Sequence, residues 1–491
     1  MQTPKTCAII GAGPAGMASA VRMANKGYQV TVFETNSQAG GKLSQSEIEG
    51  YRFDMGPSVF TMPHFVDELF TISGKNPRDY YEYISLDPVY RYFYEDGTAI
   101  VAHKNPTQFA QEIEKKTGEK AATVEKFLQK ITKTYDLTAD IFLHNSLHKL
   151  KNYFTYRVLK GILNFNRLEA FKTMYQANQQ TFKDARVVQL FNRYATYNGS
   201  DPYKAPATLN LIPHLEVNLG AYIPKGGMYA ITKGIVKLAE DIGVQFRYNT
   251  KVQEIVLQNG KAIGIKVNNE TLLFDCIISN MDVYNTYKYL LPQTKAPQKT
   301  LSQPKSSSAI IFYWGIRKSF SQLGLHNIFF SKNYAEEFEH ITDKKSIYHD
   351  PTIYLNISSK KVPEDAPEGC ENWFTMINAP HNAGQDNWDE MIAQARENMI
   401  EKLNRNLQTD IRPLIACELI WEPRKIENIT SSAFGAIYGN SSNNKFAAFL
   451  RHANFSSRIK NLYFAGGSVH PGPSIPLCML SAKITTNLVK N

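Results

Sequence analysis

The feature that most constrains the fold is a glycine-rich turn between an apolar run and a helical one. Residues 6–10 read Thr-Cys-Ala-Ile-Ile, residues 11–16 read Gly-Ala-Gly-Pro-Ala-Gly, and a helical pattern continues to residue 27. A second apolar run, residues 29–33, ends at Glu34. This order predicts a strand, a tight turn, a helix and a parallel strand, which is the arrangement of a dinucleotide-binding site.

Each glycine of the turn has its own physical task in such a site. Gly11 permits the tight turn, Gly13 lets the backbone approach a pyrophosphate at the helix N-terminus, and Gly16 lets the helix lie close to the strand. Glu34 is placed to accept hydrogen bonds from a ribose 2′-hydroxyl, which favours FAD or NAD over NADP. Because a strand, a helix and an acid all accompany the turn, dinucleotide binding is favoured over an ordinary surface turn.

A second glycine pair narrows the choice to a flavin. Gly40 and Gly41 precede Lys42, and residues 50–58 read Gly-Tyr-Arg-Phe-Asp-Met-Gly-Pro-Ser. This pattern resembles the extended flavin motif of glutathione-reductase-type and amine-oxidase-type enzymes, which NAD dehydrogenases lack. The glycine pair brings backbone N–H groups close to a diphosphate, and Lys42 can offset its charge. The alternative, a glycine-rich surface loop, is less favoured because two turn elements follow Glu34 in succession.

Size and charge bound the remaining possibilities. A chain of 491 residues predicts two or three lobes, and its 43% hydrophobic and 20% charged residues indicate a globular protein. The net charge of +10 suits nucleic acid or an anionic membrane surface, but no nucleic-acid-reading motif accompanies it. We expect no membrane-spanning segment, and no room for a signal peptide before the first strand.

The cysteines and histidines suggest neither disulfides nor a metal site. The five cysteines are scattered and form no CxxC pair, which predicts reduced packing residues in a cytoplasmic protein. His144 and His148 are four residues apart, but no third ligand of known spacing accompanies them, so we expect no metal.

The middle of the chain divides into a helical part and two strand-rich parts. Residues 107–195 are helical in character, residues 229–241 and 388–407 predict helices, and residues 262–267 and 271–278 predict one small strand group. The predicted domain pieces are 1–75, 76–215, 216–285, 286–425 and 426–491, with the first, third and fifth forming the dinucleotide lobe.

Residues 139–175 interleave apolar and aromatic positions at roughly helical spacing with six basic residues, against the two acids Asp140 and Glu169. A basic helix with an aromatic face can lie in a membrane interface. A core helix whose solvated face happens to be basic is the equal alternative.

The C-terminal segment carries a second strong pattern. Residues 461–483 read Asn-Leu-Tyr-Phe-Ala-Gly-Gly-Ser-Val-His-Pro-Gly-Pro-Ser-Ile-Pro-Leu-Cys-Met-Leu-Ser-Ala-Lys, which predicts a strand, a glycine turn and a closing helix. The N-terminus of that helix can direct its positive end toward an anionic oxygen, such as that of a reduced flavin ring.

Together with residues 50–58, 222–231 and 279–282, these motifs resemble the bacterial phytoene-desaturase family of carotenoid desaturases across the whole chain. The resemblance implies an α/β fold: a Rossmann-like FAD-binding domain of glutathione-reductase or amine-oxidase type, a discontinuous α+β substrate domain and a helical membrane-associated part. One departure is Pro473 and Ser474, where many relatives carry glycine. The cofactor-binding residues that the resemblance implies are Gly11, Gly13, Ala15, Gly16, Glu34, Gly40, Gly41, Lys42, Gly56, Pro57, Ser58, Val252 (through its backbone, to the adenine), Gly467, Ser468, Ile475 and Pro476.

The implied reaction converts a –CH2–CH2– unit beside a conjugated chain into a double bond, with hydride leaving to flavin N5 and a proton leaving from the resulting cation. The family works at a membrane surface, which implies a cytoplasmic protein attached peripherally to the inner face of the membrane, with oxygen or a quinone as electron acceptor. No catalytic base can be named. The C-terminal pattern favours 3,4-desaturation of a 1-hydroxylated acyclic carotenoid, and phytoene desaturation is the alternative. An amine-oxidase-like flavoenzyme, which would need an aromatic cage, and a lipid carrier of the same fold are the other readings.

Overall fold

Parallel strands from distant stretches of the chain form the sheet that carries the first glycine turn. In the computed structural model, which describes residues 4–142, 146–149, 169, 171–444 and 450–490, the order of this sheet is β10-β2-β1-β14-β20. Its strands are β1 (Thr6–Ile10), β2 (Gln29–Phe33), β10 (Gln245–Arg247), β14 (Cys276–Ser279) and β20 (Leu462–Phe464). The last four residues of β1 are buried, which explains why a central parallel strand reads as a continuous apolar run.

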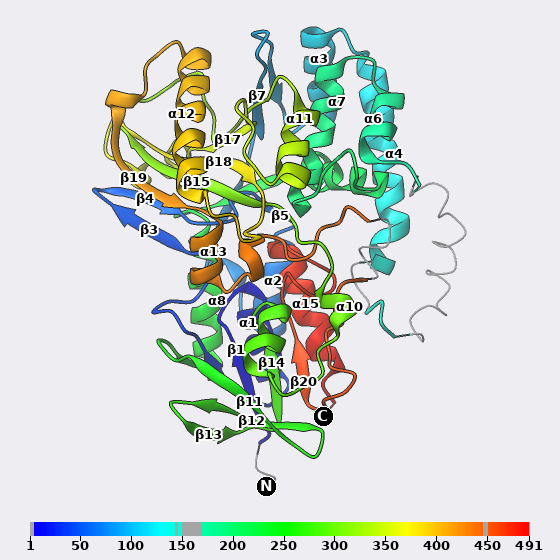
Figure 1. Cartoon of the computed structure of the whole chain (residues 1–491), viewed down its shortest axis with the longest axis vertical. Helices are drawn as coiled ribbons and strands as arrows, with labels where there is room; N and C mark the ends of the chain where they lie inside the picture. Colours follow the sequence, from blue (N-terminus) through cyan, green and yellow to red (C-terminus); the bar gives the residue numbers. More distant parts are fainter. Residues whose placement is uncertain (1–3, 143–145, 150–168, 170, 445–449, 491) are drawn as a thin grey trace.

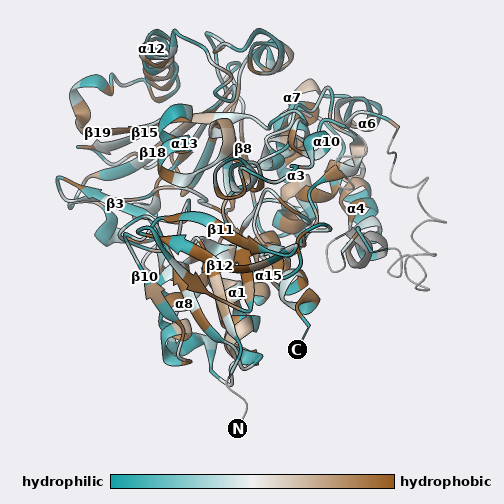
Figure 2. Ribbon diagram, turned by 60° about the horizontal axis from the view of Figure 1, so that its bottom comes forward, coloured by the Kyte–Doolittle hydropathy of each residue, from teal (hydrophilic) through white to brown (hydrophobic). Residues whose placement is uncertain are grey.

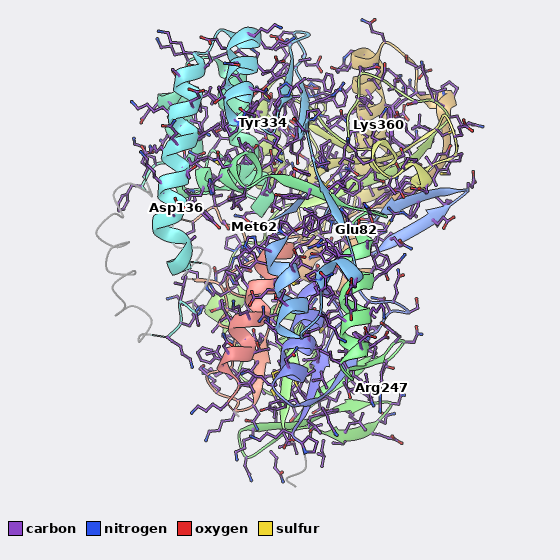
Figure 3. All side chains as sticks on the ribbon, turned by 180° about the vertical axis from the view of Figure 1, so that it is seen from behind. Met62, Glu82, Asp136, Arg247, Tyr334 and Lys360 are labelled. Atoms are coloured by element: carbon purple, nitrogen blue, oxygen red, sulfur yellow. The ribbon has the colours of Figure 1, made fainter. Side chains whose placement is uncertain are left out.

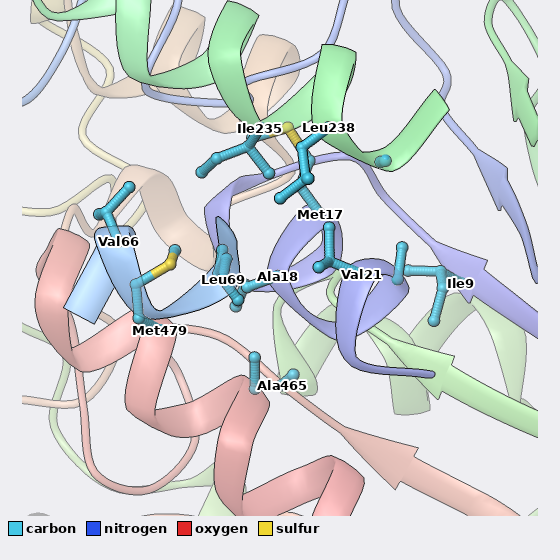
Figure 4. Packing of buried hydrophobic residues seen from close by; sticks show 14 of the residues in the cluster. Ile9, Met17, Ala18, Val21, Val66, Leu69, Ile235, Leu238, Ala465 and Met479 are labelled. Carbon is cyan, nitrogen blue, oxygen red and sulfur yellow. The ribbon is translucent and has the colours of Figure 1, made fainter. Parts of the chain in front are cut away.

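Helix α1 (Pro14–Asn25) lies at the centre of this lobe. It packs against α2 (His64–Ile72), α8 (Tyr229–Asp241) and α15 (Ile475–Leu488). Figure 4 shows Met17, Ala18 and Val21 of α1 among side chains from these three helices. Small residues along α1 let the helices approach closely, so the first helix and the last one share a single core.

A second, mixed sheet supports the other lobe (Figure 1), in the order β19-β15-β18-β17-β16-β7-β8. Its strands are β7 (Tyr90–Phe93), β8 (Ala99–Ala102), β15 (Ser308–Ile316), β16 (His326–Phe329), β17 (Ile353–Asn356), β18 (Glu371–Ala379) and β19 (Ile415–Trp421). The two segments that the sequence assigns to substrate binding, 76–215 and 286–425, thus contribute strands to one sheet. The predicted domain boundaries themselves stay a prediction.

The remaining elements connect and cover the two large sheets. The smaller strands are β3 (Gln45–Ile48), β4 (Tyr51–Asp54), β5 (Phe60–Thr61), β6 (Tyr83–Ser85), β9 (Ala221–Pro224), β11 (Val252–Gln258), β12 (Lys261–Val267) and β13 (Glu270–Leu273). The other helices are α3 (Pro106–Thr117), α4 (Ala121–Phe142), α6 (Met174–Thr181), α7 (Ala185–Asn192), α9 (Val283–Asn285), α10 (Gln298–Leu301), α11 (Tyr334–Glu339), α12 (Trp388–Leu407) and α13 (Pro423–Thr430). Figure 2 shows hydrophobic residues gathered on β11, β12 and α15.

The strand group predicted over 262–278 is wrong in one respect. β13 belongs to the small sheet β11-β12-β13, whereas β14 joins the parallel sheet beside β1. Asp275 lies between these two strands in the sequence. Its carboxylate accepts hydrogen bonds from the Thr6 backbone N–H at 2.8 Å and from the Thr6 hydroxyl at 3.0 Å. This contact lies at the point where the chain passes from the small sheet to the parallel sheet.

The basic segment 139–175 falls mostly outside the described residues, so its helix stays a prediction. Within the part of the chain that the structure does describe, no helix has the length and apolar character needed to cross a membrane.

Candidate functional site

The glycines of the first turn allow neighbouring atoms to approach the backbone closely. The Gly11 N–H donates to the carbonyl oxygen of Phe33 at 2.8 Å, which closes the turn against β2. A Cβ atom on Gly16 would lie 2.1 Å from the Gly11 carbonyl oxygen, and one on Gly13 would lie 2.7 Å from Asn280 Oδ1. α1 begins directly afterwards, and within the described residues its first turn has neither a side-chain cap nor an acid. Its N-terminal N–H groups are therefore available to an anion.

Glu34 is held beside this turn by hydrogen bonds to both carboxylate oxygens. Oε2 accepts from the Ala12 N–H at 2.8 Å, and Oε1 accepts from the Asn36 N–H at 2.9 Å. Glu34 also accepts from the Thr250 N–H through its carbonyl oxygen, at 2.8 Å, which brings it close to Val252 at the start of β11. The structure therefore brings together the two residues predicted to meet the adenosine part of FAD.

The second glycine pair lies against the first turn. The Gly40 N–H donates to the Ala12 carbonyl at 2.9 Å, and a Cβ atom on Gly41 would lie 3.5 Å from the Cα atom of Gly13. Gly56 is packed on the Lys42 carbonyl oxygen, which a Cβ atom would meet at 1.9 Å.

Lys42 itself donates from Nζ to the Ile437 carbonyl at 2.8 Å. Burial lowers the pKa of its ammonium group, an effect that the charge of Asp282 opposes. A half-buried cation thus lies beside both glycine turns. Pro57 and Ser58 follow Gly56, and the Ser58 hydroxyl lies 2.6 Å from the Tyr354 hydroxyl.

Asn280 joins the two ends of the chain at this site, and it belongs to segment 279–282, where the sequence alone assigns it no role. Its Nδ2 donates to the Ala465 carbonyl at 2.7 Å, while its Oδ1 faces the space beside Gly13. A Cβ atom on Gly466 would lie 2.8 Å from the same Nδ2. The amide side chain of Asn280 therefore lies between the N-terminal glycine turn and the C-terminal glycine turn.

The C-terminal turn leads into α15. The Ser468 hydroxyl accepts from the Val283 N–H at 3.0 Å, and Gly467 lies against Pro473. Ile475 and Pro476 form the first turn of α15, both buried, and the Ser474 hydroxyl caps it by accepting from the Leu477 N–H at 3.3 Å.

Arg451 is a residue that no sequence motif marks. It is 4% exposed, and its guanidinium donates to the carbonyl oxygens of Gly467 at 3.2 Å, Asn440 at 3.2 Å and Tyr438 at 3.4 Å. These partners are all uncharged, and burial lowers the pKa of Arg451 to about 10. Among the described residues it has no carboxylate partner, so it is a buried cation that can pair with an anionic ligand.

These features fit FAD. Two glycine turns leave room for a diphosphate, the α1 N-terminus and the cations Lys42 and Arg451 supply positive charge, and Glu34 offers a carboxylate to a ribose. The individual contacts stay predictions. No group of three or more possible metal-ligating side chains occurs within the described residues.

A cluster of tyrosines lies in the other lobe, around the side chain of Arg193. The ring centroids lie between 4.5 and 5.5 Å from the guanidinium carbon. The rings belong to Tyr90, Tyr92, Tyr194 and Tyr197. Glu216 completes the cluster, with Oε1 3.7 Å from Arg193 Nη2 and 2.6 Å from the Tyr194 hydroxyl. The faces of this aromatic cage are therefore turned toward the protein's own cation and not toward a substrate amine.

The two lobes meet near Met62 (Figure 3), four residues after Ser58. Its sulfur accepts from the Tyr135 hydroxyl of α4 at 3.7 Å. Segments from the helical part therefore approach the segment that follows the predicted cofactor residues.

Residues 14–489 match the family described as flavin containing amine oxidoreductase. The chain is 50% identical to a 1-hydroxycarotenoid 3,4-desaturase of Flavobacterium sp. (strain P99-3), over 99% of each chain. It is 30% identical to a phytoene desaturase of Fusarium fujikuroi, over 99% of this chain and 89% of the relative. A putrescine oxidase solved with bound putrescine has the same fold, with a TM-score of 0.63 at 13% identity over 99% of this chain and 98% of that one.

Proposed function

We propose that this chain, which belongs to the flavin-containing amine oxidoreductase family, introduces a double bond at the 3,4 position of a 1-hydroxylated acyclic carotenoid. The chain is an FAD-dependent oxidoreductase. The observation that carries the substrate proposal is the 50% identity, along the whole of both chains, to a 1-hydroxycarotenoid 3,4-desaturase. Phytoene desaturation is the second candidate, supported by the 30% identity to a phytoene desaturase.

The chemistry requires an acceptor of electrons and an ordered, dry site. Bound FAD supplies the acceptor, since a flavin can take two electrons with one hydrogen as hydride from the –CH2–CH2– unit. The second hydrogen leaves as a proton, and the neighbouring conjugated chain of the substrate delocalises the positive charge. The protein's share is to hold the dinucleotide, align the substrate bond and exclude water.

Several residues are proposed to hold the dinucleotide. Gly13 and Gly41 leave the diphosphate its space, Lys42 and Arg451 oppose its charge, and Glu34 accepts hydrogen bonds from the ribose. No carboxylate or imidazole is assigned as a base, because the polyene itself stabilises the cation that loses the proton.

The same proposal includes a membrane surface, since a carotenoid is available from lipid. Residues 139–175 would lie on the anionic inner face of the membrane through their basic and aromatic side chains, with the rest of the protein in the cytoplasm. Oxygen or a quinone would reoxidise the flavin.

The test is a competition in membranes that contain both phytoene and a 1-hydroxylated acyclic carotenoid. The FAD-loaded protein is expected to convert the hydroxylated carotenoid, and the added double bond shifts its absorption to longer wavelength. Conversion of phytoene alone would replace this proposal with phytoene desaturation. A protein that purifies colourless, without flavin absorption, would instead indicate a lipid carrier.

A further inference from the structure

His326 is a buried histidine on the strand β16, and one of its ring nitrogens has no hydrogen-bond partner in the part of the chain that the structure describes. The side chain is 1% exposed and stacks on Tyr90, with ring centroids 5.0 Å apart. Nδ1 lies 2.8 Å from the Tyr354 hydroxyl and 3.1 Å from Asn356 Nδ2. Nε2 is buried without a hydrogen-bond partner among the described residues.

The neighbours of His326 determine which nitrogen carries the proton. Asn356 Nδ2 also donates to the Leu325 carbonyl at 3.2 Å, so this atom is the amide nitrogen and must donate to His326 Nδ1 as well. Burial, with the charge of Arg193, lowers the pKa of His326 to about 3, which keeps the imidazole neutral. Nδ1 therefore accepts, and the single ring proton resides on Nε2. The unpartnered group is thus a donor.

A short chain of hydrogen bonds links the imidazole ring, through Nδ1, to the predicted flavin site. Because His326 Nδ1 accepts, the Tyr354 hydroxyl donates to it, and the Ser58 hydroxyl in turn donates to Tyr354 at 2.6 Å. Ser58 and His326 consequently bond the same phenol oxygen. Ser58 belongs to the segment that is predicted to contact FAD, so His326 lies one tyrosine hydroxyl away from it.

We propose that the Nε2–H group of His326 donates a hydrogen bond to the hydroxyl oxygen of the carotenoid substrate and thereby selects a 1-hydroxylated end group. This inference rests on the proposed function. Nε2 is closed to water, so a polar group delivered with an apolar substrate is what would satisfy it. The same hydrogen bond removes the free-energy cost of burying the substrate hydroxyl in an apolar site without a partner.

The chemistry of the substrate also requires the partner to lie near the flavin. One carbon separates C1, which bears the hydroxyl, from C3 of the bond that is oxidised, so the oxygen lies within about 4 Å of C3 and about 5 Å of C4. His326 is joined through Tyr354 to Ser58, which belongs to the segment predicted to contact FAD.

The experiment compares two substrates, a 1-hydroxylated acyclic carotenoid and the same carbon skeleton without the hydroxyl, with FAD-loaded protein in liposomes. His326→Leu is expected to lower kcat/KM for the hydroxylated substrate by about tenfold, because one hydrogen bond is lost, and to leave the other substrate nearly unchanged. His326→Gln retains an N–H donor and should recover part of the preference. His340→Leu, on the half-buried His340 of the same lobe, is the matched control and should change neither value.

Flavin content and melting temperature of each variant separate recognition from misfolding. An equal loss on both substrates in the Leu and Gln variants would overturn the assignment and give His326 a structural role. A wild-type preference for the hydroxyl that survives His326→Leu would overturn it while leaving the proposed function intact. Wild-type activity on phytoene alone would overturn the proposed function and this inference together.

Discussion

Arg451 donates a hydrogen bond from Nη1 to the carbonyl oxygen of Gly467 at 3.2 Å, which places a buried guanidinium directly against the C-terminal glycine turn. Its other guanidinium hydrogen bonds to the described residues also end on neutral carbonyl oxygens. A buried charge without a counter-ion is costly, so proteins retain one where a ligand supplies the opposite charge. The negatively charged FAD diphosphate would supply it here.

Replacing Arg451 by Gln is therefore expected to weaken FAD binding by about tenfold or more, since a charge-assisted contact is lost. Titration of the flavin-free protein with FAD, followed by quenching of flavin fluorescence, measures the change. Arg451→Lys keeps the charge but loses the planar fork, and should fall between Gln and the wild type. If the Gln variant bound FAD as tightly as the wild type, Arg451 would have only a structural role in the loop.

The glycines of the first turn are expected to differ in what their substitution damages. Gly13 has a φ of −70°, which alanine adopts readily, and its Cβ would meet only the side chain of Asn280. Gly13→Ala should therefore fold but purify with little flavin, because the methyl group occupies the diphosphate space. Gly16→Ala would drive a Cβ atom against the Gly11 carbonyl and should lower the melting temperature.

A double variant, Gly13→Ala with Asn280→Ala, separates the two effects. It should recover any stability lost to the contact with Asn280 without recovering flavin. Normal flavin content in either folded variant would contradict the placement of the diphosphate.

Local sequence patterns predicted the helices whose formation depends on residues that are neighbours along the chain. The helices expected over 229–241 and 388–407 coincide with α8 and α12, because their apolar periodicity and flanking turn residues are properties of the segment itself. The residues to which the sequence assigned no role make their contacts with parts of the chain that are distant in sequence. Asn280 meets Gly13, Arg451 meets Gly467, and His326 is linked to Ser58 only because β16 and β17 pair in one register. No spacing within a single sequence reports contacts of that kind.

Ser474 adopts a backbone conformation that suits glycine. Its φ is 127° and its ψ is 163°, a region that side chains with a Cβ atom rarely enter, at a cost of about 1–3 kcal/mol. Ser474→Gly removes this strain and costs only a few tenths of a kcal/mol in capping of α15. We expect the variant to be more stable by about 1 kcal/mol, measured by denaturant unfolding. Ser474→Ala keeps the strain and loses the cap, so it should be less stable than the wild type, and a Gly variant no better than Ala would contradict the assignment of strain.

Glu337 on α11 provides a pH test. Its carboxyl accepts from the Thr352 N–H at 2.9 Å and from the Thr352 hydroxyl at 2.7 Å, and burial raises its pKa to about 7. The unfolded chain releases this proton near a pKa of about 4.3, so the folded state binds more protons between there and pH 7. The contribution of Glu337 to stability is thus present below this window and is lost as the pH rises through 7, by at most about 1.4 kcal/mol per pH unit.

Glu337→Gln removes that titration. The stability of the Gln variant minus that of the wild type is expected to increase from pH 5 to pH 7 and to level off above it, as followed by denaturant unfolding at each pH. Glu339→Gln, on the exposed side of the same helix, controls for the loss of one acidic side chain. A difference that stays constant from pH 5 to pH 8 would show that the Glu337 carboxyl titrates alike in both states.

Membrane binding is tested through the basic residues of segment 139–175. Each Lys or Arg near an anionic surface contributes about 1 kcal/mol, and salt screens this attraction beyond about 10 Å at 0.1 M. Charge reversal of Lys149, Lys151, Arg157 and Lys160 to Glu should therefore abolish most co-sedimentation with anionic liposomes at low salt, and the wild type should itself release as salt increases. Reversal of Lys233, Lys237, Lys251 and Lys261, exposed lysines of the FAD-binding lobe, changes the net charge equally and should preserve most of the binding. Equal loss in both variants would attribute liposome binding to net charge alone, whereas unchanged binding in the first would assign segment 139–175 to packing against the rest of the protein.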